Sequence, residues 1–333
     1  MDDINIPLLV IAGPTASGKS TLAVALAKEL HGEVVNIDSV QIYLGCDIGS
    51  GKITSLEAQG VRHHLIDIRD PDACVDVAEI CNEAKTAIAE VVNHKKLPIV
   101  VAGSTMYVRS LFHGLASLPG KDMALRKELD DLSSLDLFAE LNKHDPESAL
   151  KLHPNDRVRI IRALEVFYLT REKISTVHLK HSYSGADFKA LFLCLSWRRE
   201  DLHARIAART EKMMAHGILT ETEQLMNLYG ENAPVLKTVG YAECVQVLKK
   251  EKVSSSLKES INASTRQLAK RQITFWRNQP SALKWKIRAS CDEVDRATLI
   301  ESVAARLRET LLTNEIWYLD AARIFESNAN PLG

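Results

Sequence analysis

The sequence predicts an α/β fold in which a parallel β-sheet, flanked by helices, carries an all-helical insertion. Three observations predict it. Short apolar runs bounded by turn residues recur along the chain, which is typical of buried parallel strands. Amphipathic patterns with helical spacing lie between these runs, so strands and helices alternate. Between residues 118 and 187 the strand-like runs stop and only helical patterns remain.

Five apolar runs are predicted as strands of the sheet. They are Leu8–Ala12, Val34–Ile37, His64–Ile68, Ile99–Ala102 and Ala190–Leu195. The helices predicted around them are Thr21–Leu30, Val77–Asn93, Thr105–Phe112, Arg199–His216, Leu219–Leu228, Tyr241–Leu248 and Ser255–Trp276. In a parallel sheet of this kind, ligands bind at the carboxyl ends of the strands, so residues just after each strand are the first candidates for a functional site.

The length of 333 residues suits a main domain with an insertion. We expect residues 1–117 and 188–333 to form a discontinuous core domain whose C-terminal part is mostly helical. We expect residues 118–187 to form the helical insertion. Its predicted helices are Met123–Leu132, Leu135–Asn142 and Asp156–Thr170, with breaks at the two prolines Pro146 and Pro154.

Composition excludes several classes of protein. A hydrophobic content of 46% is ordinary for a globular domain, and the formal net charge of −1 gives no bulk signal for nucleic acid. No apolar run approaches the roughly 20 residues that span a membrane, and the acidic start is unlike a signal peptide. The six cysteines form no C-x-x-C pair and no zinc-like cluster. These features predict a cytoplasmic protein with reduced thiols.

The segment GPTASGKS, residues 13–20, fits the pattern of a phosphate-binding loop, G-x-x-x-x-G-K-[ST], at every position. It follows a predicted strand and leads into a predicted helix, as that loop requires. Backbone N–H groups and the helix N-terminus attract an anion there, and Lys19 adds a full charge. The Ser20 hydroxyl can bind a magnesium ion. This segment predicts binding of a di- or triphosphate.

Two polar residues follow other predicted strands. Asp38 follows the second strand and can act as a general base or bind magnesium through water, although an Asp-Ser pair is also common in plain turns. Ser104 follows the fourth strand, after Gly103. Its hydroxyl can donate to a phosphate or a leaving oxygen, or it can simply cap the helix that begins at Thr105.

Basic residues gather in three places. Arg205 and Arg209 are four apart on one helix face, where guanidinium groups can bind pyrophosphate oxygens or can be solvated surface. The stretches 153–173 and 266–277 are rich in arginine and lysine, and the second contains no acid. Either stretch alone is typical of a solvated helix, but two of them beside a phosphate loop favour a polyanionic substrate.

Taken in order over roughly residues 8–280, the chain resembles the bacterial tRNA dimethylallyltransferases, also called tRNA isopentenyltransferases. The resemblance rests on a phosphate loop, the helix of Arg205 and Arg209, and a late basic block. The motifs are GPTASGKS (13–20), DSVQIY (38–43), DIGSGK (47–52), HHLIDIRDP (63–71), HPNDRVRIIRALEV (153–166), VGY (239–241) and TRQLAKRQITFWR (265–277).

The resemblance implies a P-loop kinase-like sheet and the transfer of a dimethylallyl group from dimethylallyl diphosphate to N6 of adenosine 37. The tRNAs would be those that read codons beginning with U, and the product would be N6-(dimethylallyl)adenosine. It implies catalytic roles for Asp38 as general base, Ser104 and Arg209. It places Mg²⁺ on Ser20 and the diphosphate on Gly13, Thr15, Ala16, Ser17, Gly18, Lys19, Ser20 and Arg205.

The same resemblance implies that the anticodon stem-loop of tRNA binds both the core and the insertion, with no obligate protein partner and a monomeric enzyme. The implied contacts fall on Asp38, Ser39, Val40, Gln41, Ser104, Arg126, Val158, Arg159, Ile160, Ile161, Arg162, Lys237, Thr238, Val239, Gly240, Tyr241, Ala242, Lys270, Arg271, Gln272, Ile273, Thr274, Phe275, Trp276 and Arg277. The chain departs from the family pattern at Leu44, Val75, Ala102 and Ser104.

Three other functions compete with this one. A P-loop nucleotide kinase explains the phosphate loop equally well but gives the basic block at 266–277 no purpose. An enzyme that prenylates free adenine nucleotides would not need tRNA-binding segments. A non-catalytic tRNA-binding relative would be consistent with the departures from the family pattern, whereas the presence of Asp38, Lys19 and Arg209 favours an enzyme.

Overall fold

The structure is a computed structural model that describes residues 7–114, 116, 118–180, 188–282, 286–291, 301–303, 305 and 315–320. The chain divides into two compact units. The core unit comprises Met1–Phe112 and Ala186–Gly333, and the insert unit comprises His113–Gly185. The insertion predicted at 118–187 differs from the insert unit by five residues at its start and two at its end.

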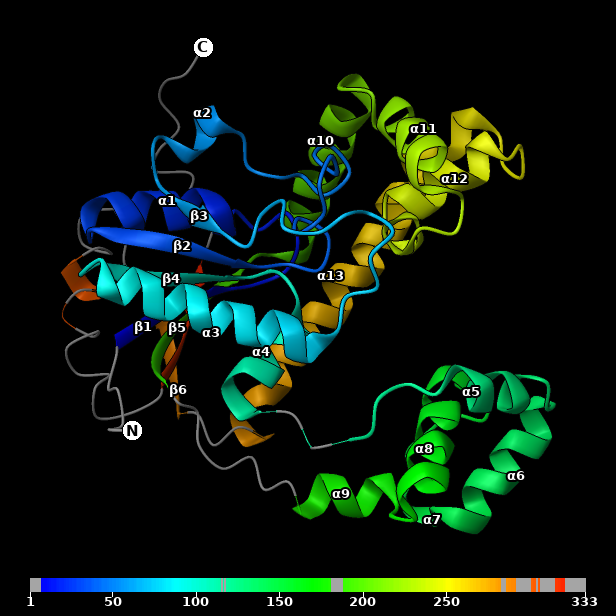
Figure 1. Cartoon of the computed structure of the whole chain (residues 1–333). Coiled ribbons are helices and arrows are strands. Elements are labelled where there is room, and N and C mark those ends of the chain that lie inside the picture. Colours follow the sequence, from blue (N-terminus) through cyan, green and yellow to red (C-terminus); the bar gives the residue numbers. More distant parts are fainter. Residues whose placement is uncertain are drawn as a thin grey trace. The chain divides into compact units, whose positions relative to one another are not determined.

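A seven-stranded sheet, with every neighbouring pair parallel, forms the centre of the core unit (Figure 1). The strand order is β3-β2-β4-β1-β5-β7-β6. The strands are β1 (Pro7–Ala12), β2 (Gly32–Ile37), β3 (His63–His64), β4 (Leu97–Ala102), β5 (Lys189–Ser196), β6 (Lys286–Cys291) and β7 (Glu315–Asp320). The first five correspond to the predicted strands, whereas β6 and β7 were not predicted.

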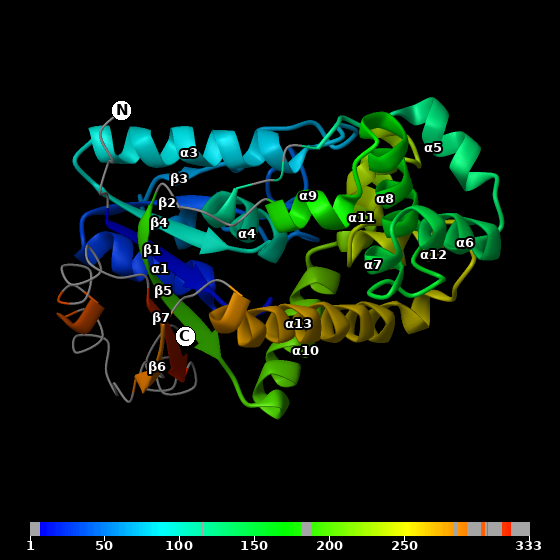
Figure 2. The same cartoon turned by 90° about the horizontal axis from the view of Figure 1, so that it is seen from below.

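The predicted helices of the core are present, although the one predicted at Ser255–Trp276 continues six residues further, to Ala282, and the short helix Ser55–Ala58 was not predicted. The helices are α1 (Lys19–Glu29), α2 (Ser55–Ala58), α3 (Val77–Asn93), α4 (Thr105–His113), α10 (Arg199–Ala215), α11 (Ile218–Tyr229), α12 (Tyr241–Leu248) and α13 (Leu257–Ala282), with short 3₁₀ helices at Pro234–Lys237 and Ser254–Ser256. The long helix α13 packs across α10 (Figure 2). Among the described residues, no helix combines the length and the apolar character that crossing a membrane requires.

Helices cover both faces of the sheet. Successive side chains of a strand point to opposite faces, so β1 contributes to two hydrophobic clusters. Leu8 and Val10 pack in one cluster with residues of α3 and α4. Leu9 and Ile11 pack in the other with residues of α1. Because both faces are buried, these strands are apolar at successive positions instead of alternating.

The predicted strand His64–Ile68 is wrong beyond its first residue. The structure has a strand only at His63–His64. Leu65 and Asp67 adopt left-handed backbone conformations, with φ of 62° and 55°. A residue in that conformation cannot continue a β-ladder, so the apolar run turns away from the sheet.

The insert unit is a helical bundle with its own core. Its helices are α5 (Met123–Asp130), α6 (Ser134–His144), α7 (Pro146–Ala149), α8 (Arg157–Thr170) and α9 (Ile174–Lys180). Leu137 and Leu141 of α6 and Leu164 of α8 are completely buried together. Pro146, predicted as a break, is the first residue of α7, where its missing N–H costs nothing.

Candidate active site

The carboxyl ends of four neighbouring strands meet at one large cavity in the core unit. Gly13 follows β1, Asp38 follows β2, Gly103 follows β4 and Trp197 follows β5. The cavity has a volume of about 1180 Å³ and is lined by the phosphate loop, Asp38–Gln41, the loop 47–54, Gly103–Thr105 and helices α10 and α13. Residues far apart in the sequence therefore converge where a parallel sheet binds its ligands.

The phosphate loop has the backbone that its sequence predicts. Gly13 and Gly18 have φ of 140° and 93°, and a Cβ on Gly13 would lie 2.9 Å from the carbonyl oxygen of Leu195. Gly18 is the N-cap of α1 and gives that helix no side-chain cap. The Ser17 hydroxyl is buried and has no hydrogen-bond partner among the described residues. The loop and the helix N-terminus therefore offer donors to an anion.

Lys19 holds its charge without a carboxylate partner. Its Nζ donates to the carbonyl oxygens of Gly13 at 3.1 Å and Pro14 at 2.8 Å. Among the described residues it forms no ion pair. Burial lowers the pKa of Lys19 to about 8, although the negative charge of Asp38 opposes the shift. An anion in the cavity would stabilise the ammonium group.

Arg209 is held in the same way. It projects from α10, and its Nη1 donates to Thr15 Oγ1 at 3.3 Å and its Nη2 to the carbonyl oxygen of Ser50 at 2.8 Å. It has no ion-pair partner in the part of the chain that the structure describes. Burial lowers the pKa of Arg209, and Asp38 opposes this. Gly51, at φ 58°, leaves the room that the guanidinium occupies, because a Cβ there would lie 2.5 Å from Nη2.

Arg205 supports the phosphate loop. Its Nε donates to the carbonyl oxygen of Ala16 at 2.8 Å, and its guanidinium stacks on Trp197, 4.4 Å from the ring centre. Trp197 Nε1 in turn donates to the carbonyl oxygen of Ser17 at 3.1 Å. Arg205 also lines the cavity, so its contact with a diphosphate stays a prediction.

Asp38 uses one carboxylate oxygen for structure and leaves the other to the cavity. Oδ1 accepts hydrogen bonds from the backbone N–H groups of Val40 at 2.8 Å and Gln41 at 3.2 Å, which is the Asx turn considered from the sequence. Oδ2 accepts no hydrogen bond from any described residue. A Cβ at Gly103 would collide with Oδ2, so only glycine at 103 allows this arrangement.

Gln272 joins two parts of the site. Its Oε1 accepts a hydrogen bond from the Thr15 N–H at 2.8 Å, and its Nε2 donates to the carbonyl oxygen of Gly103 at 3.0 Å. The side chain thus connects α13 with the phosphate loop and with the end of β4. Ser104 lines the cavity, and its hydroxyl forms no helix cap or other hydrogen bond with the described residues.

Comparison with known proteins identifies the family. A family model described as IPP transferase matches residues 41–279. The tRNA dimethylallyltransferase 1 of Citrifermentans bemidjiense is 40% identical over 281 residues, which cover 84% of this chain and 92% of that protein. The tRNA dimethylallyltransferase of Anaeromyxobacter sp. is 39% identical over 299 residues, covering 89% and 99% of the two chains. This chain belongs to the IPP transferase family.

Solved structures of similar proteins agree with this membership. The full-length tRNA isopentenylpyrophosphate transferase from Bacillus halodurans matches with a TM-score of 0.64 at 30% identity, over 91% of this chain and 97% of that one. A eukaryotic dimethylallyltransferase acting on tRNA matches with a TM-score of 0.73 at 29% identity, over 94% and 73%. The predicted fold class of this IPP transferase, a P-loop kinase-like parallel sheet flanked by helices, is confirmed.

Basic residues predicted to bind tRNA are exposed in both units. On α13, Lys270, Arg271 and Arg277 are exposed, and Arg271 also lines the cavity. In the insert unit Arg159 is exposed, whereas Arg126 and Arg162 are held by the buried carboxylate of Glu165. The remaining exposed or half-buried members of the predicted set are Ser39, Val40, Gln41, Val158, Lys237, Thr238, Val239, Ala242, Ile273, Thr274 and Phe275.

Five side chains in the predicted tRNA-binding set are buried in packing or bracing positions, and their contact with tRNA stays a prediction. Ile160 and Ile161 lie in the core of the insert unit. Tyr241 and Trp276 are at most 2% exposed, in the main core of the core unit. Gln272 is buried, and both the oxygen and the nitrogen of its side-chain amide are hydrogen-bonded. The prediction treated each motif as a continuous contact surface, but a helix turns every third or fourth residue inward.

Two buried carboxylates were missed from the sequence. Glu165 organises Arg126 and Arg162, and Glu221 of α11 binds the loop 47–49. An acidic residue in the apolar positions of α8 was a readable signal for Glu165. Glu221 had no such signal, because three of its four hydrogen-bond partners are backbone N–H groups more than 170 residues away.

Proposed function

We propose that this protein transfers a dimethylallyl group from dimethylallyl diphosphate to N6 of adenosine 37 in tRNA, with Asp38 as the general base. The proposal rests on one observation: a carboxylate oxygen of Asp38 without a hydrogen bond within the described residues and two half-buried cations, Lys19 and Arg209, line the same cavity. Asp38 Oδ2 accepts no hydrogen bond from the described residues, and neither Lys19 nor Arg209 has a carboxylate partner there. A proton acceptor and an anion site are thus adjacent.

The nucleophile needs a base. The lone pair of adenine N6 is delocalised into the ring, so N6 attacks weakly while it keeps both protons. As the bond between N6 and C1 of the dimethylallyl group forms, the C1–O bond breaks and its electron pair leaves with the diphosphate. The N6 proton passes to Asp38 Oδ2, while Oδ1 stays bound to Val40 and Gln41 and fixes the carboxylate plane.

The leaving diphosphate gains charge as the C1–O bond breaks. The diphosphate would sit at the phosphate loop, next to Lys19, Arg209 and the N-terminus of α1. Ser104 lines the same cavity. These donors are partly shielded from water and already oriented, so they stabilise the developing charge without costly reorganisation. The neutral groups that now hold Lys19 and Arg209 compete weakly with a diphosphate for them.

The residues present fit a magnesium ion that is held mainly by the diphosphate. Ser20 lines the cavity at the start of α1, and no group of three His, Cys, Asp or Glu side chains in the described part could hold a metal alone. Magnesium commonly binds to a few protein oxygens plus phosphates and water. When bound, it would neutralise part of the charge on the leaving group.

The nucleic-acid substrate must reach Asp38. An adenine stacked in an anticodon loop has to be flipped out to enter such a cavity. The exposed Lys270, Arg271 and Arg277 on α13 and Arg159 on α8 support contacts with the phosphates of the stem-loop. We also propose that the monomer is sufficient, and that it works in the cytoplasm where tRNA is modified.

The test is a transfer assay with purified protein, Mg²⁺, dimethylallyl diphosphate and unmodified tRNA, followed by mass spectrometry of the digested nucleosides. We expect N6-(dimethylallyl)adenosine, and none when adenosine 37 is replaced. Asp38→Ala should lower the single-turnover rate by about 10²–10⁴-fold with diphosphate binding nearly unchanged. Transfer of phosphate from ATP to a small acceptor instead would support the kinase. An Asp38→Ala variant as fast as wild type would remove Asp38 as the base.

A further inference from the structure

A buried carboxylate organises the loop that follows β2. Glu221 on α11 is 9% exposed, and its Oε2 accepts hydrogen bonds from the N–H groups of Asp47 at 3.0 Å and Ile48 at 2.8 Å. Its Oε1 accepts one from the N–H of Gly49 at 2.9 Å. Three successive backbone N–H groups thus donate to one carboxylate. The loop surrounds this side chain as an anion-binding nest surrounds its anion, and the contact fixes the loop.

Tyr241 completes the environment of this carboxylate. Its hydroxyl donates to Glu221 Oε1 at 2.7 Å, and its ring lies where a Cβ on Gly49 would collide with it. Glu221 forms no ion pair within the described residues, so its charge is balanced by four hydrogen bonds alone. Four acceptor positions are what a carboxylate offers and an amide does not.

The loop that Glu221 holds also holds Arg209. The carbonyl oxygen of Ser50, directly after Gly49, accepts hydrogen bonds from Arg209 Nη2 at 2.8 Å and from Gln41 Nε2 at 3.3 Å. Thr15 provides the other contact of the guanidinium. The direction of the Arg209 side chain therefore depends on the position of the Ser50 carbonyl, which depends on the loop.

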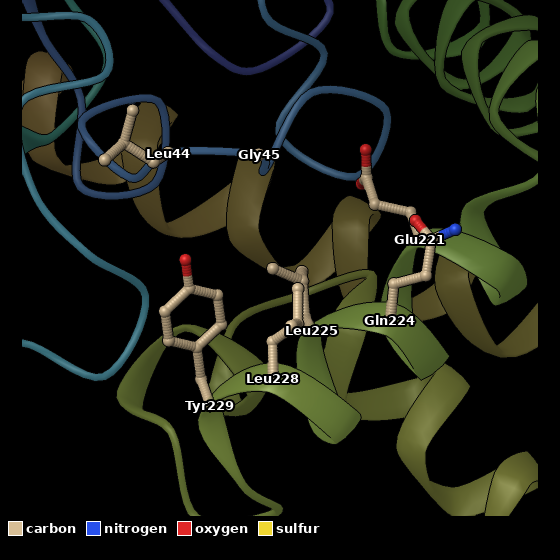
Figure 3. Close-up of a pocket in the computed structure, with 7 residues that line it drawn as sticks. All are labelled: Leu44, Gly45, Glu221, Gln224, Leu225, Leu228 and Tyr229. Atoms are coloured by element: carbon tan, nitrogen blue, oxygen red, sulfur yellow. The ribbon is translucent and has the colours of Figure 1, made fainter.

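Glu221 also borders a second, smaller cavity, but its carboxylate is used for hydrogen bonds to the loop. Figure 3 shows Glu221 reaching from α11 toward the segment that follows Gly45, while Leu225, Leu228 and Tyr229 line a small cavity of about 160 Å³ on the same helix. Glu221 itself lines that cavity too, together with Leu44, Gly45 and Gln224. The carboxylate of Glu221 is directed to the loop, where its hydrogen bonds are formed.

We propose that Glu221 is a positioning residue that sets Arg209 on the diphosphate through the loop 47–50. This inference rests on the proposed function, because it takes the anion beside Arg209 to be the diphosphate of the prenyl donor. Tyr241 supports Glu221 in this role through its hydrogen bond to the carboxylate. It connects the loop to the segment 237–242, whose exposed members are proposed to contact tRNA.

Glutamine at 221 tests the need for a carboxylate. In Glu221→Gln an amide N–H would face a loop N–H, so the loop shifts and the Ser50 carbonyl moves. With inorganic pyrophosphate as the probe in calorimetry, we expect about tenfold weaker binding, a reduction in the range of one charged hydrogen bond. In the transfer assay, kcat should fall by a similar factor while KM for tRNA stays unchanged. Glu223→Gln, exposed on the same helix, is the matched control and should bind as wild type does.

A double-mutant cycle with Arg209→Met shows whether Glu221 acts through the arginine. We expect Glu221→Gln to weaken pyrophosphate binding by less than about twofold once Arg209 is gone. An equal effect in both backgrounds, or no effect in the wild-type background, would overturn the inference. Tyr241→Phe, which keeps the three loop hydrogen bonds, should cost no more than about threefold.

Pyrophosphate binding also separates this inference from the proposed function. If wild-type protein binds pyrophosphate but forms no prenylated tRNA, the proposed function fails while the binding cycle still decides the role of Glu221. If prenylated tRNA forms and the cycle shows no coupling between positions 221 and 209, the proposed function stands and the role of Glu221 fails.

Discussion

The core unit and the insert unit each contain half-buried arginine side chains, and the two units hold them in opposite ways. In the insert unit Arg126 donates Nε and Nη2 to the two oxygens of Glu165, both at 2.7 Å, and Arg162 Nη1 donates to the same carboxylate at 2.5 Å. Among the described residues of the core unit, Arg209 donates hydrogen bonds only to a hydroxyl and a carbonyl oxygen, and Lys19 only to two carbonyl oxygens.

The difference separates structural charges from functional ones. Burial alone would raise the pKa of Glu165, but the hydrogen bonds from Arg126 and Arg162 outweigh it and lower that pKa to about 2. Each of these two arginines in the insert therefore has a carboxylate partner within the protein. Burial instead lowers the pKa of Lys19 to about 8, so the core tolerates a cation that nothing in the described protein neutralises. Such a site costs stability, and the proposed diphosphate would supply the missing anion.

Arg209→Met gives the largest expected effect on activity. Removing one oriented donor from a developing negative charge lowers kcat by about 10²–10³-fold. The melting temperature should stay the same or rise, because no partner carboxylate is left unpaired. Kinetics in the transfer assay and calorimetric melting measure both. Arg199→Met, exposed on the same helix, is the control. A large fall in melting temperature with Arg209→Met would show that this arginine is structural like those of the insert.

Glu165→Gln should have the opposite profile. It leaves Arg126 and Arg162 buried in part without their anion, which we expect to cost about 2–4 kcal/mol of stability in the insert. Hydrogen exchange should show reduced protection in α5 and α8 and little change in the sheet. Glu147→Gln, an exposed acid of α7, should leave protection unchanged. An effect of Glu147→Gln as large as that of Glu165→Gln would contradict the assignment.

The effect of Glu165→Gln should depend on pH. Because the pKa of Glu165 falls from 4.5 to about 2 on folding, its contribution to stability is fully present above about pH 4.5. The contribution disappears as the pH falls toward about 2. The difference in exchange protection between wild type and Glu165→Gln should therefore shrink over that range. A difference that persists at the acid end of the range would mean that shape, and not charge, is responsible.

Lys19→Met should stabilise the core while abolishing pyrophosphate binding. The unfolded state holds the Lys19 proton up to about pH 10.5 and the folded state only up to about pH 8, so stability rises with pH between these values. At about pH 7 we expect the substitution to add roughly 1–2 kcal/mol in urea unfolding, less than the full pKa difference because the ammonium is half-buried. The gain should shrink as the pH approaches about 10. Destabilisation at neutral pH would refute this expectation.

The smallest effect on folding is expected for Arg271→Ala combined with Arg277→Ala. Both side chains are exposed on α13, so stability should not change. Binding of tRNA should weaken, and the salt dependence of the binding constant should become less steep by about 0.7–0.9 for each phosphate that the protein no longer neutralises. Filter binding over a series of salt concentrations measures this slope. An unchanged slope would place these arginines away from the nucleic acid.

Much of the fold followed from local patterns. The helix Val77–Asn93 was predicted to the residue, because its apolar positions recur at helical spacing in the sequence. The prediction of a strand at His64–Ile68 was wrong because Leu65 and Asp67 have positive φ. Glycine and asparagine signal such a backbone in a sequence, but this segment contains neither. The inward positions Ile160 and Ile161 could have been separated from Arg159 by helical period alone.

The sequence by itself determined which chemical groups stand at the strand ends: a phosphate loop after β1, a carboxylate after β2 and a hydroxyl after β4. Residue type settles what each group can donate or accept. Only the tertiary structure decided what each group is free to do. Among the described residues Arg209 has no carboxylate partner and Arg126 has one, because the groups that meet each guanidinium come from residues far away in the chain. Many of those partners are backbone atoms, which every residue carries, so sequence patterns cannot announce them.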